Sequence, residues 1–327
     1  MKLAMFDAGH GPTVGILHSD GSLLDLAEAA RLSNFTGVSF ASIMALIEQG
    51  EPALDAARSL EAHCPDEAVI EADKARLLCP IHPPRLRDTL MFLEHLEQGL
   101  DRWARNLAAD EADPEAAFLS LKATGRYDLH PVFRRKVIYY NANHLAVSGP
   151  DEVIEWPQNS TNADFELEFA CVMGRSIRNA DETEAASAIF GYTIFNDWSA
   201  RDLQLDFMLA NLGPAGGKDF AGGNTLGPCI VTADEIPDPY NLAMTVRVNG
   251  ATISNGSTAS MHHKFEHGIA EFSQLDAIVP GEVIASGTVL NGSGYEQGMQ
   301  LGDGDTVELE IEGIGVLRNS IRMQKHG

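Results

Sequence analysis

Hydrophobic and polar positions alternate over much of the chain after residue 137, which is typical of β-strands that bury one face. The clearest example is Asp164-Phe165-Glu166-Leu167-Glu168-Phe169, which continues into the apolar run Ala170-Cys171-Val172-Met173. Alternation sends the three acids to one face of the strand and the three apolar side chains to the other. Similar patterns predict short strands over residues 137–140, 166–173, 191–195, 230–232, 243–248, 251–254, 283–286, 306–311 and 315–320.

Helical periodicity is concentrated in the first third of the chain. It predicts helices over residues 24–31, 40–49, 52–63 and 85–109, and two later ones over 199–212 and 261–275. Residues 110–130 are acidic and are predicted to form a loop. The proline-rich connector at 79–84 predicts a boundary between a small N-terminal domain (1–80) and a larger domain (81–327). Many short strands with few helices favour a mainly β (α+β) roll or sandwich over a doubly wound sheet.

Composition narrows the classes of function. The chain has 327 residues, 44% of them hydrophobic and 21% charged, as is usual for soluble globular proteins. It has no apolar run of membrane-spanning length and no pattern of a signal peptide, so we expect a cytoplasmic protein without a membrane partner. The net charge of −24 argues against nucleic acid as a partner. The four cysteines have no C-x-x-C spacing and are predicted to be free, mostly buried thiols.

The acids of the 164–169 strand are the first candidate for chemistry. Residues i and i+2 of a strand are about 7 Å apart, and two ionised carboxylates at that separation repel by roughly 2–3 kcal/mol at an effective dielectric constant of about 20. A bound divalent cation would relieve this repulsion, since hard cations prefer oxygen ligands. A half-exposed strand with its acids in water is the alternative that this segment alone leaves open.

A second candidate segment is Asn196-Asp197-Trp198-Ser199-Ala200-Arg201-Asp202-Leu203-Gln204. An apolar strand ends at Asp197, and Ser199 is predicted to cap the helix that follows. Arg201 and Gln204 are three residues apart and therefore share a helix face. An ordinary acidic helix start with a neighbouring polar pair is the alternative.

Other segments carry weaker signals. The glycine-dense loop 213–223 holds Lys218, but Asp219 departs from the phosphate-binding order G-x-x-x-x-G-K-[ST]; a positioned cation and a solvated lysine both remain open. Asp88 and His95 are seven apart on the predicted 85–109 helix and would share a face, although a structural histidine is the alternative. Residues 286–288 and 292–296 offer flexible backbone and one more acid. His262 and His263 are predicted to be surface residues without a role.

Together these segments resemble the fumarylacetoacetate hydrolase superfamily over roughly residues 85–327. The 164–168 segment is similar to the family's metal-binding E-x-E strand, and 196–204 is similar to its N-D-x-S-A-R-D-x-Q signature. Segments at 217–220, 286–288 and 313–319 follow in the family's order. The resemblance implies a mixed β-sandwich roll as the catalytic domain, a small N-terminal α/β domain and a homodimer. It also implies a divalent metal, usually Mg²⁺ and alternatively Ca²⁺ or Mn²⁺.

The resemblance also implies residue roles. The implied metal ligands are Glu166, Glu168, Asp197 and, as in the longer members, Asp88. The implied catalytic residues are His95, its orienting acid Glu296, and Lys218, and the implied substrate contacts are Arg201, Gln204 and Thr288. The chain departs from the family's pattern at three places. Leu90 stands where longer members carry a substrate-binding tyrosine, and the stretch after Lys218, at residues 221–224, is about two residues longer than is usual in the family. Gln98 stands where the shorter members have the acid of their H-x-x-E pair.

The activity expected from this resemblance is hydrolysis of a carbon–carbon bond in a small anionic β-diketo acid of the fumarylacetoacetate or acylpyruvate type. The metal would chelate the enol and keto oxygens, and His95 would activate water. Two alternatives stay open: a decarboxylase, isomerase or hydratase of a 2-oxo or 2-hydroxydienoic acid from aromatic catabolism, and a binding or scaffold protein without catalysis. The metal with Arg201 and Lys218 would supply the positive charge that an anionic substrate needs in this acidic chain.

Overall fold

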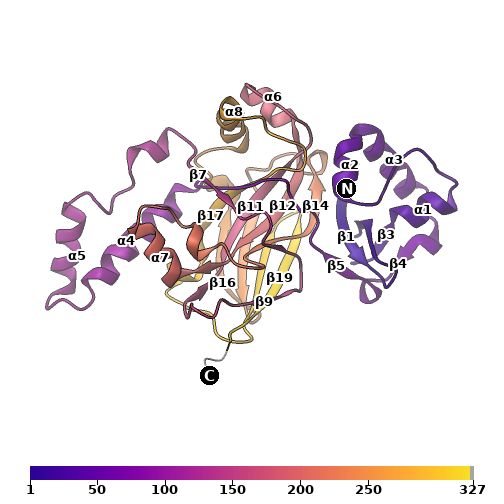
Figure 1. Cartoon of the computed structure of the whole chain (residues 1–327). Helices are drawn as coiled ribbons and strands as arrows, with labels where there is room; N and C mark the ends of the chain where they lie inside the picture. The colour runs from indigo at the N-terminus through magenta and orange to yellow at the C-terminus, as the bar shows by residue number, and fades with distance from the viewer. Residues whose placement is uncertain (325–327) are drawn as a thin grey trace.

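A computed structural model describes residues 1–324, and two β-sheets form its centre (Figure 1). The larger sheet has twelve strands, and β5 (Arg76–Leu78) and β8 (Val147–Ser148) pair with β1 and β14 beside the main path. Its main path runs in the spatial order β4 (Val69–Ile70), β3 (Leu23–Asp25), β2 (Pro12–Leu17), β1 (Lys2–Asp7), β14 (Asn224–Thr232), β12 (Ile189–Asp197), β11 (Glu166–Met173), β17 (Val283–Ser293), β6 (Leu86–Thr89) and β7 (Tyr139–Ala142).

A second sheet of five strands packs against β12, β14 and β17 and closes the central sandwich. Its order is β16 (Ala251–Ser257), β15 (Ala243–Val248), β18 (Thr306–Ile311), β19 (Gly315–Arg322) and β9 (Val153–Glu155). Phe165, Phe169 and Trp198 are fully buried between the layers. A short pair, β10 (Ala163–Asp164) and β13 (Ser199–Ala200), lies beside the sandwich. The expected α+β class with large sheets is therefore confirmed.

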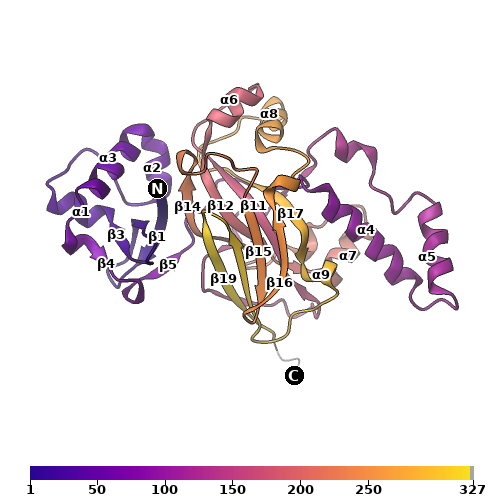
Figure 2. The same ribbon diagram turned by 180° about the vertical axis from the view of Figure 1, so that it is seen from behind.

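The N-terminal residues form an α/β unit at one side of the sandwich (Figures 1 and 2). Three helices, α1 (Leu26–Leu32), α2 (Ile43–Gln49) and α3 (Glu51–Ala62), bury their apolar faces in a core shared with β1 and β2. Strand β1 pairs antiparallel with β14, with Lys2 opposite Val231 and Leu3 opposite Ile230. The large sheet therefore runs without interruption across the boundary predicted near residue 80.

The remaining helices surround the sandwich. They are α4 (Leu93–Ala108), α5 (Pro114–Ala123), α6 (Glu182–Ser187), α7 (Arg201–Leu209), α8 (Phe265–Leu275) and α9 (Gly294–Gln297). Helices α4 and α5 project from the body as an arm, defined here as residues 93–132 (Figures 1 and 2). The arm has a small core of its own around Ala104, Phe118 and Tyr127. Among residues 1–324, no helix combines the length and the apolar character needed to span a bilayer.

The longer alternating patterns formed strands as predicted, and Asn249-Gly250 makes the expected tight turn between β15 and β16 with φ of 52° and 78°. Two predictions of secondary structure were wrong. Residues 86–89 are a strand, not the start of a helix, because they pair with β17 on one side and β7 on the other. The segment 110–130 contains α5, which Asp113 caps and Pro114 begins, as both residues favour helix starts.

Candidate active site

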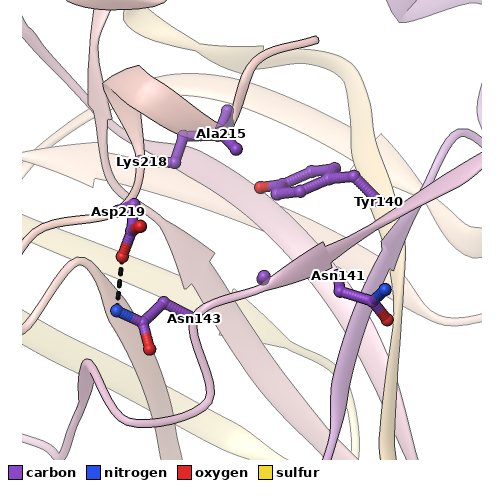
Figure 3. A pocket seen from close by; sticks show the side chains of 7 residues that line it. Tyr140, Asn141, Asn143, Ala215, Lys218 and Asp219 are labelled. Atoms are coloured by element: carbon purple, nitrogen blue, oxygen red, sulfur yellow. Dashed lines mark hydrogen bonds between the residues drawn. The ribbon is translucent and has the colours of Figure 1, made fainter. Parts of the chain in front are cut away.

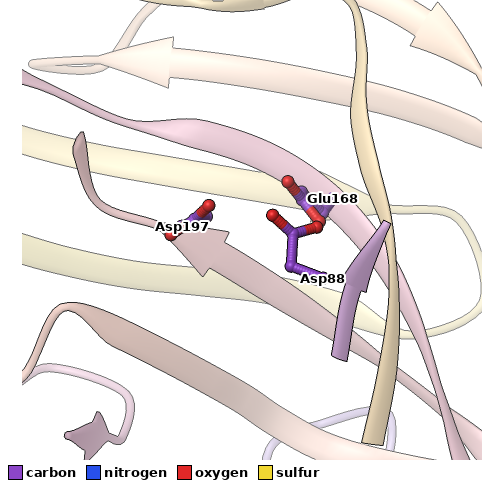
Figure 4. Close-up of side chains that lie close together, drawn as sticks. All are labelled: Asp88, Glu168 and Asp197. Atoms are coloured by element: carbon purple, nitrogen blue, oxygen red, sulfur yellow. The ribbon is translucent and has the colours of Figure 1, made fainter. Parts of the chain in front are cut away.

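Three buried acids from separate strands converge at one end of the large sheet (Figure 4). Asp88 lies on β6, Glu168 on β11 and Asp197 at the end of β12. Each offers a carboxylate oxygen, and these oxygens lie within 4.8 Å of one another. The three residues are 6%, 1% and 0% exposed. The predicted positions of Asp88 and His95 on one helix face were wrong, since Asp88 belongs to the strand that precedes the helix.

This acidic triad fits a divalent cation. Within residues 1–324, one oxygen of each acid (Asp88 Oδ1, Glu168 Oε1 and Asp197 Oδ1) has no hydrogen-bond partner. The pKa of Asp88 is raised well above its ordinary value by burial and by the nearby charge of Asp197. The pKa of Glu168 is also raised well above its ordinary value, by burial and by the charges of Asp88 and Asp197. Buried carboxylates with free oxygens are costly unless a positive charge compensates them. An oxygen-only donor set of this kind suits Mg²⁺, Ca²⁺ or Mn²⁺.

Glu166, also predicted as a ligand, is not among the three acids whose oxygens lie within 4.8 Å of one another, and its role as a ligand stays a prediction. Its carboxylate lies 2.5 Å from Lys218 Nζ and 2.8 Å from an Arg201 guanidinium nitrogen. Burial alone would raise the pKa of Glu166, but these two cations outweigh it and lower the pKa. The pairing of β11 with β17 shifts register between Glu166 and Glu168, and such a bulge re-aims a side chain relative to simple alternation.

Lys218 is a buried, positioned cation and not a solvated loop lysine, which settles the open alternative. It is 4% exposed, and its Nζ lies 2.5 Å from both Glu166 and Asp197 and donates to Ser199 Oγ at 2.9 Å. The preceding Gly217 allows this depth, because a Cβ there would meet Gln204 N at 2.6 Å and Ala200 O at 2.7 Å. Burial alone would lower the pKa of Lys218, but Asp197 and Glu166 raise it. The lysine is therefore held as an ammonium.

Arg201 links the acids to the start of α7. Its Nε donates to Asp164 Oδ2 at 2.7 Å, and its Nη1 donates to Gln204 Oε1 at 2.9 Å, as two side chains on one helix face can. Asp164 also accepts the backbone N–H groups of Gly294 and Tyr295, so both of its carboxylate oxygens have hydrogen-bond donors. The predicted cap was wrong: Ala200 is the N-cap residue of α7, and Ser199 instead serves Lys218.

His95 lies beside this acid–cation cluster, on the first turn of α4. Its Nδ1 is 2.9 Å from Glu296 Oε2, and its Nε2 is 4.0 Å from Glu166. Glu296 is held by the N–H groups of Asn291 and Ser293 and by the Ser293 hydroxyl, in a capping box at the start of α9. Burial lowers the pKa of His95, but Glu296 outweighs it and the net shift is upward. The structure thus brings the histidine and its predicted acid together.

A cavity of about 280 Å³ opens next to Asp197, and Figure 3 shows the side chains that line it. Sequence reasoning missed Tyr140, which borders this cavity and donates its hydroxyl to Asp197 Oδ2 at 3.0 Å. The only signal was its place on a predicted strand, with no motif around it. Thr288, a predicted substrate contact, is 2% exposed and lies opposite Glu168 on β17. The cavity is lined by Tyr140, Asn141, Ala142, Asn143, Ala215, Lys218 and Asp219.

The chain is similar to known proteins across this region. Residues 121–322 match the family model for the fumarylacetoacetate (FAA) hydrolase C-terminal domain. A human protein, oxaloacetate tautomerase FAHD2A, mitochondrial, is 29% identical over 98% of this chain and 91% of its own length. An uncharacterized protein of Archaeoglobus fulgidus is 41% identical over 58% of this chain and 70% of its own length.

Solved structures agree with the fold. The fumarylacetoacetate hydrolase of Exiguobacterium antarcticum is 26% identical with a TM-score of 0.73, over 99% of this chain and 100% of that one. Maleylpyruvate hydrolase of Sphingobium sp. SYK-6, solved with manganese(II) and pyruvate, is 21% identical with a TM-score of 0.70, over 99% and 100% of the two chains, and supports the fold alone.

Proposed function

Because the chain belongs to the fumarylacetoacetate hydrolase family, we propose that it is a metal-dependent hydrolase that cleaves a carbon–carbon bond in a β-diketo acid such as an acylpyruvate. The observation that carries this proposal is the pair His95–Glu296, 2.9 Å apart, beside the acidic triad. A general base oriented by a carboxylate is what activation of water requires. A binding protein without catalysis would have no use for it.

Asp88, Glu168 and Asp197 would hold the divalent cation. When bound, this cation would act as a Lewis acid toward the enol and keto oxygens of the substrate. The chain also supplies positive charge of its own at this site, since Lys218 is buried and the Arg201 side chain is only 11% exposed in a protein of net charge −24. They would attract the carboxylate of a keto acid and compensate charge that develops during the reaction.

His95 would take a proton from water at Nε2 while Glu296 holds Nδ1 and stabilises the imidazolium that forms. The hydroxide would add to the carbonyl carbon to give a tetrahedral oxyanion. As this oxyanion collapses to a carboxylic acid, the carbon–carbon bond would break and its electron pair would leave with the other fragment as an enolate, which protonated His95 would then protonate at carbon. Lys218 with Gln204 or Arg201 would stabilise the negative oxygen, and Thr288 would contact the substrate. Preorganised donors of this kind contribute about 10²–10³ in rate each.

A second candidate is keto–enol tautomerisation of a 2-oxo diacid. It is favoured by the relatives named oxaloacetate tautomerase, which match nearly the whole chain. The same base would then move a proton between carbon and oxygen, and no water would add. Products separate the two reactions: hydrolysis yields two acids, whereas tautomerisation removes the enol absorbance without cleavage. Decarboxylation would release carbon dioxide.

The test is a spectrophotometric screen of diketo, oxo and dienoic acids with Mg²⁺ and with Mn²⁺, followed by product identification. We expect the wild type to consume an acylpyruvate and yield two acids. His95→Ala should abolish turnover while Mn²⁺ binding persists, and Glu168→Ala should lose both. His82→Ala, which changes an exposed histidine in the connector, is the matched control. A His95→Ala protein that retains a near-normal rate would exclude His95 as the base.

Two further expectations accompany this proposal. We propose a homodimer, as the family resemblance implies, and sedimentation at micromolar concentration tests it. We also propose a cytoplasmic location, although the name of the human relative places that protein in mitochondria.

A further inference from the structure

The arm leaves and rejoins the body at a single place, which suggests how its orientation is set. Met91 precedes the arm, and Phe133 and Arg134 follow it, at the end of a short 3-10 helix (Pro131–Arg134) that begins within the arm. The loop before α8 contacts both ends through two adjacent residues, His262 and His263. We call these two residues the clamp.

The clamp binds the first end through its backbone and the second through its side chains. The N–H groups of His262 and His263 donate to Met91 O at 2.8 Å and 3.4 Å. The ring Nε2 of His263 lies 2.7 Å from Phe133 O, and that of His262 lies 3.2 Å from Arg134 O. A carbonyl oxygen only accepts, so each Nε2 carries the proton and donates it.

His263 is the buried member of this pair. It is 6% exposed and its ring stacks on His267 with centroids 5.3 Å apart. The body side of the clamp is firmly built: Met91 N donates to Ser286 O at 2.9 Å, and Gly268 on α8 lies so close that a Cβ there would meet Met91 Cε at 2.8 Å. The prediction that both histidines are surface residues was therefore wrong for His263.

His95 depends on this arrangement because it lies on the arm, in the first turn of α4 and four residues after Met91. Beyond the clamp, the polar contacts recorded between the described α4 and the β17–α9 region are few. His95 faces Glu296 at 2.9 Å, and Gln98 Nε2 donates to Asn291 Oδ1 at 3.1 Å. Arg102 reaches Glu296 O at 3.5 Å, and its guanidinium lies over the Tyr295 ring. The triad, by contrast, lies wholly on body strands.

We propose that His263 is a positioning residue. By bonding to both Phe133 O and Met91 O, it holds the two ends of the arm together and so keeps His95 opposite Glu296. The kinetic part of this inference rests on the proposed function. The structural part, the order of the arm, does not. Loss of the His263 donor would loosen the arm and leave the triad unchanged.

The experiment compares His263→Leu, which removes the donor at similar size, with His263→Gln, whose side-chain amide can donate to the same carbonyl. His82→Leu, at an exposed site, is the control. Hydrogen exchange of the α4 and α5 amides, Mn²⁺ affinity and kcat are measured on the full chain. For His263→Leu we expect about tenfold faster exchange in both helices and a kcat about tenfold lower, the size of one lost buried hydrogen bond. Mn²⁺ affinity should stay unchanged, and His263→Gln should restore both values to near wild type.

Unchanged exchange in His263→Leu would overturn the proposal. Equal defects in the Leu and Gln variants, or a parallel loss of Mn²⁺ affinity, would also overturn it, because they would show a general structural role. If the wild type turns over no keto acid, the proposed function fails, and the exchange comparison still decides whether His263 orders the arm.

Discussion

Glu296→Gln tests the catalytic pair with the least disturbance to the fold. With its amide oxygen at the Oε2 position, glutamine keeps the capping box with Ser293, while its amide nitrogen replaces Oε1 and gives up the hydrogen bond from Asn291 N–H. The substitution removes one charge 2.9 Å from His95 Nδ1. At an effective dielectric constant of about 20, two unit charges at that separation interact by about 6 kcal/mol. The amide oxygen can still accept from Nδ1, so only part of this stabilisation of the imidazolium is lost.

We expect kcat to fall by about 10²–10³, which corresponds to about 3–4 kcal/mol of barrier and lies within the range of general-base catalysis. Steady-state assay on the acylpyruvate identified by the screen measures the rate, and Mn²⁺ calorimetry checks that the triad is intact. Glu94→Gln is the matched control, since it removes an exposed charge on the residue next to His95. A kcat within threefold of wild type for Glu296→Gln would refute the reasoning that this acid orients and charges the base.

Three other predictions follow from the same geometry. At a Mn²⁺ concentration one hundred times Kd, the free energy of unfolding of the wild type should rise by about 3 kcal/mol. Glu168→Gln should show no metal-dependent shift in thermal unfolding, and a shift equal to that of the wild type would remove Glu168 from the ligand set. Glu166→Gln should instead lower the free energy of unfolding by about 3–5 kcal/mol in urea, because it leaves Lys218 and Arg201 undercompensated; an unchanged midpoint would contradict this account. Gly287→Ala should cost about 2–4 kcal/mol and weaken Mn²⁺ binding, since φ is +76°, a Cβ would meet Thr89 O at 2.3 Å, and Gly287 N donates to Glu168; normal stability in urea would show that the backbone can adapt.

The sequence predicted those strands whose side chains alternate over many residues. β11 was recognisable because Leu167 and Phe169 alternate with acids before a long apolar run. β6 was not recognisable, because four residues carry too little pattern and the strand is fixed by parallel pairing with β17, almost two hundred residues later. Local periodicity contains no information about such a partner.

In the candidate site, too, the sequence predicted what local motifs carry and missed what long-range contacts decide. Motif order indicated the acids, His95 and Glu296, and the structure brings His95 and Glu296 together. Alternation predicted Glu166 and Glu168 on one face of the strand. In the structure the register of β11 shifts between them, and Lys218, from a loop distant in sequence, pairs with Glu166. Tyr140 was missed for a similar reason, since only the folded chain brings its hydroxyl to Asp197.

The pairing of β1 with β14 has a practical consequence for anyone who dissects this chain. A fragment that starts after the proline-rich connector would leave one side of β14 with unsatisfied backbone donors and acceptors next to buried apolar residues such as Leu226 and Ile230. An open strand of that kind recruits other chains and promotes aggregation. Insolubility of such a truncated fragment would therefore report an uncovered sheet edge, and would say nothing about whether the remaining residues can fold or catalyse.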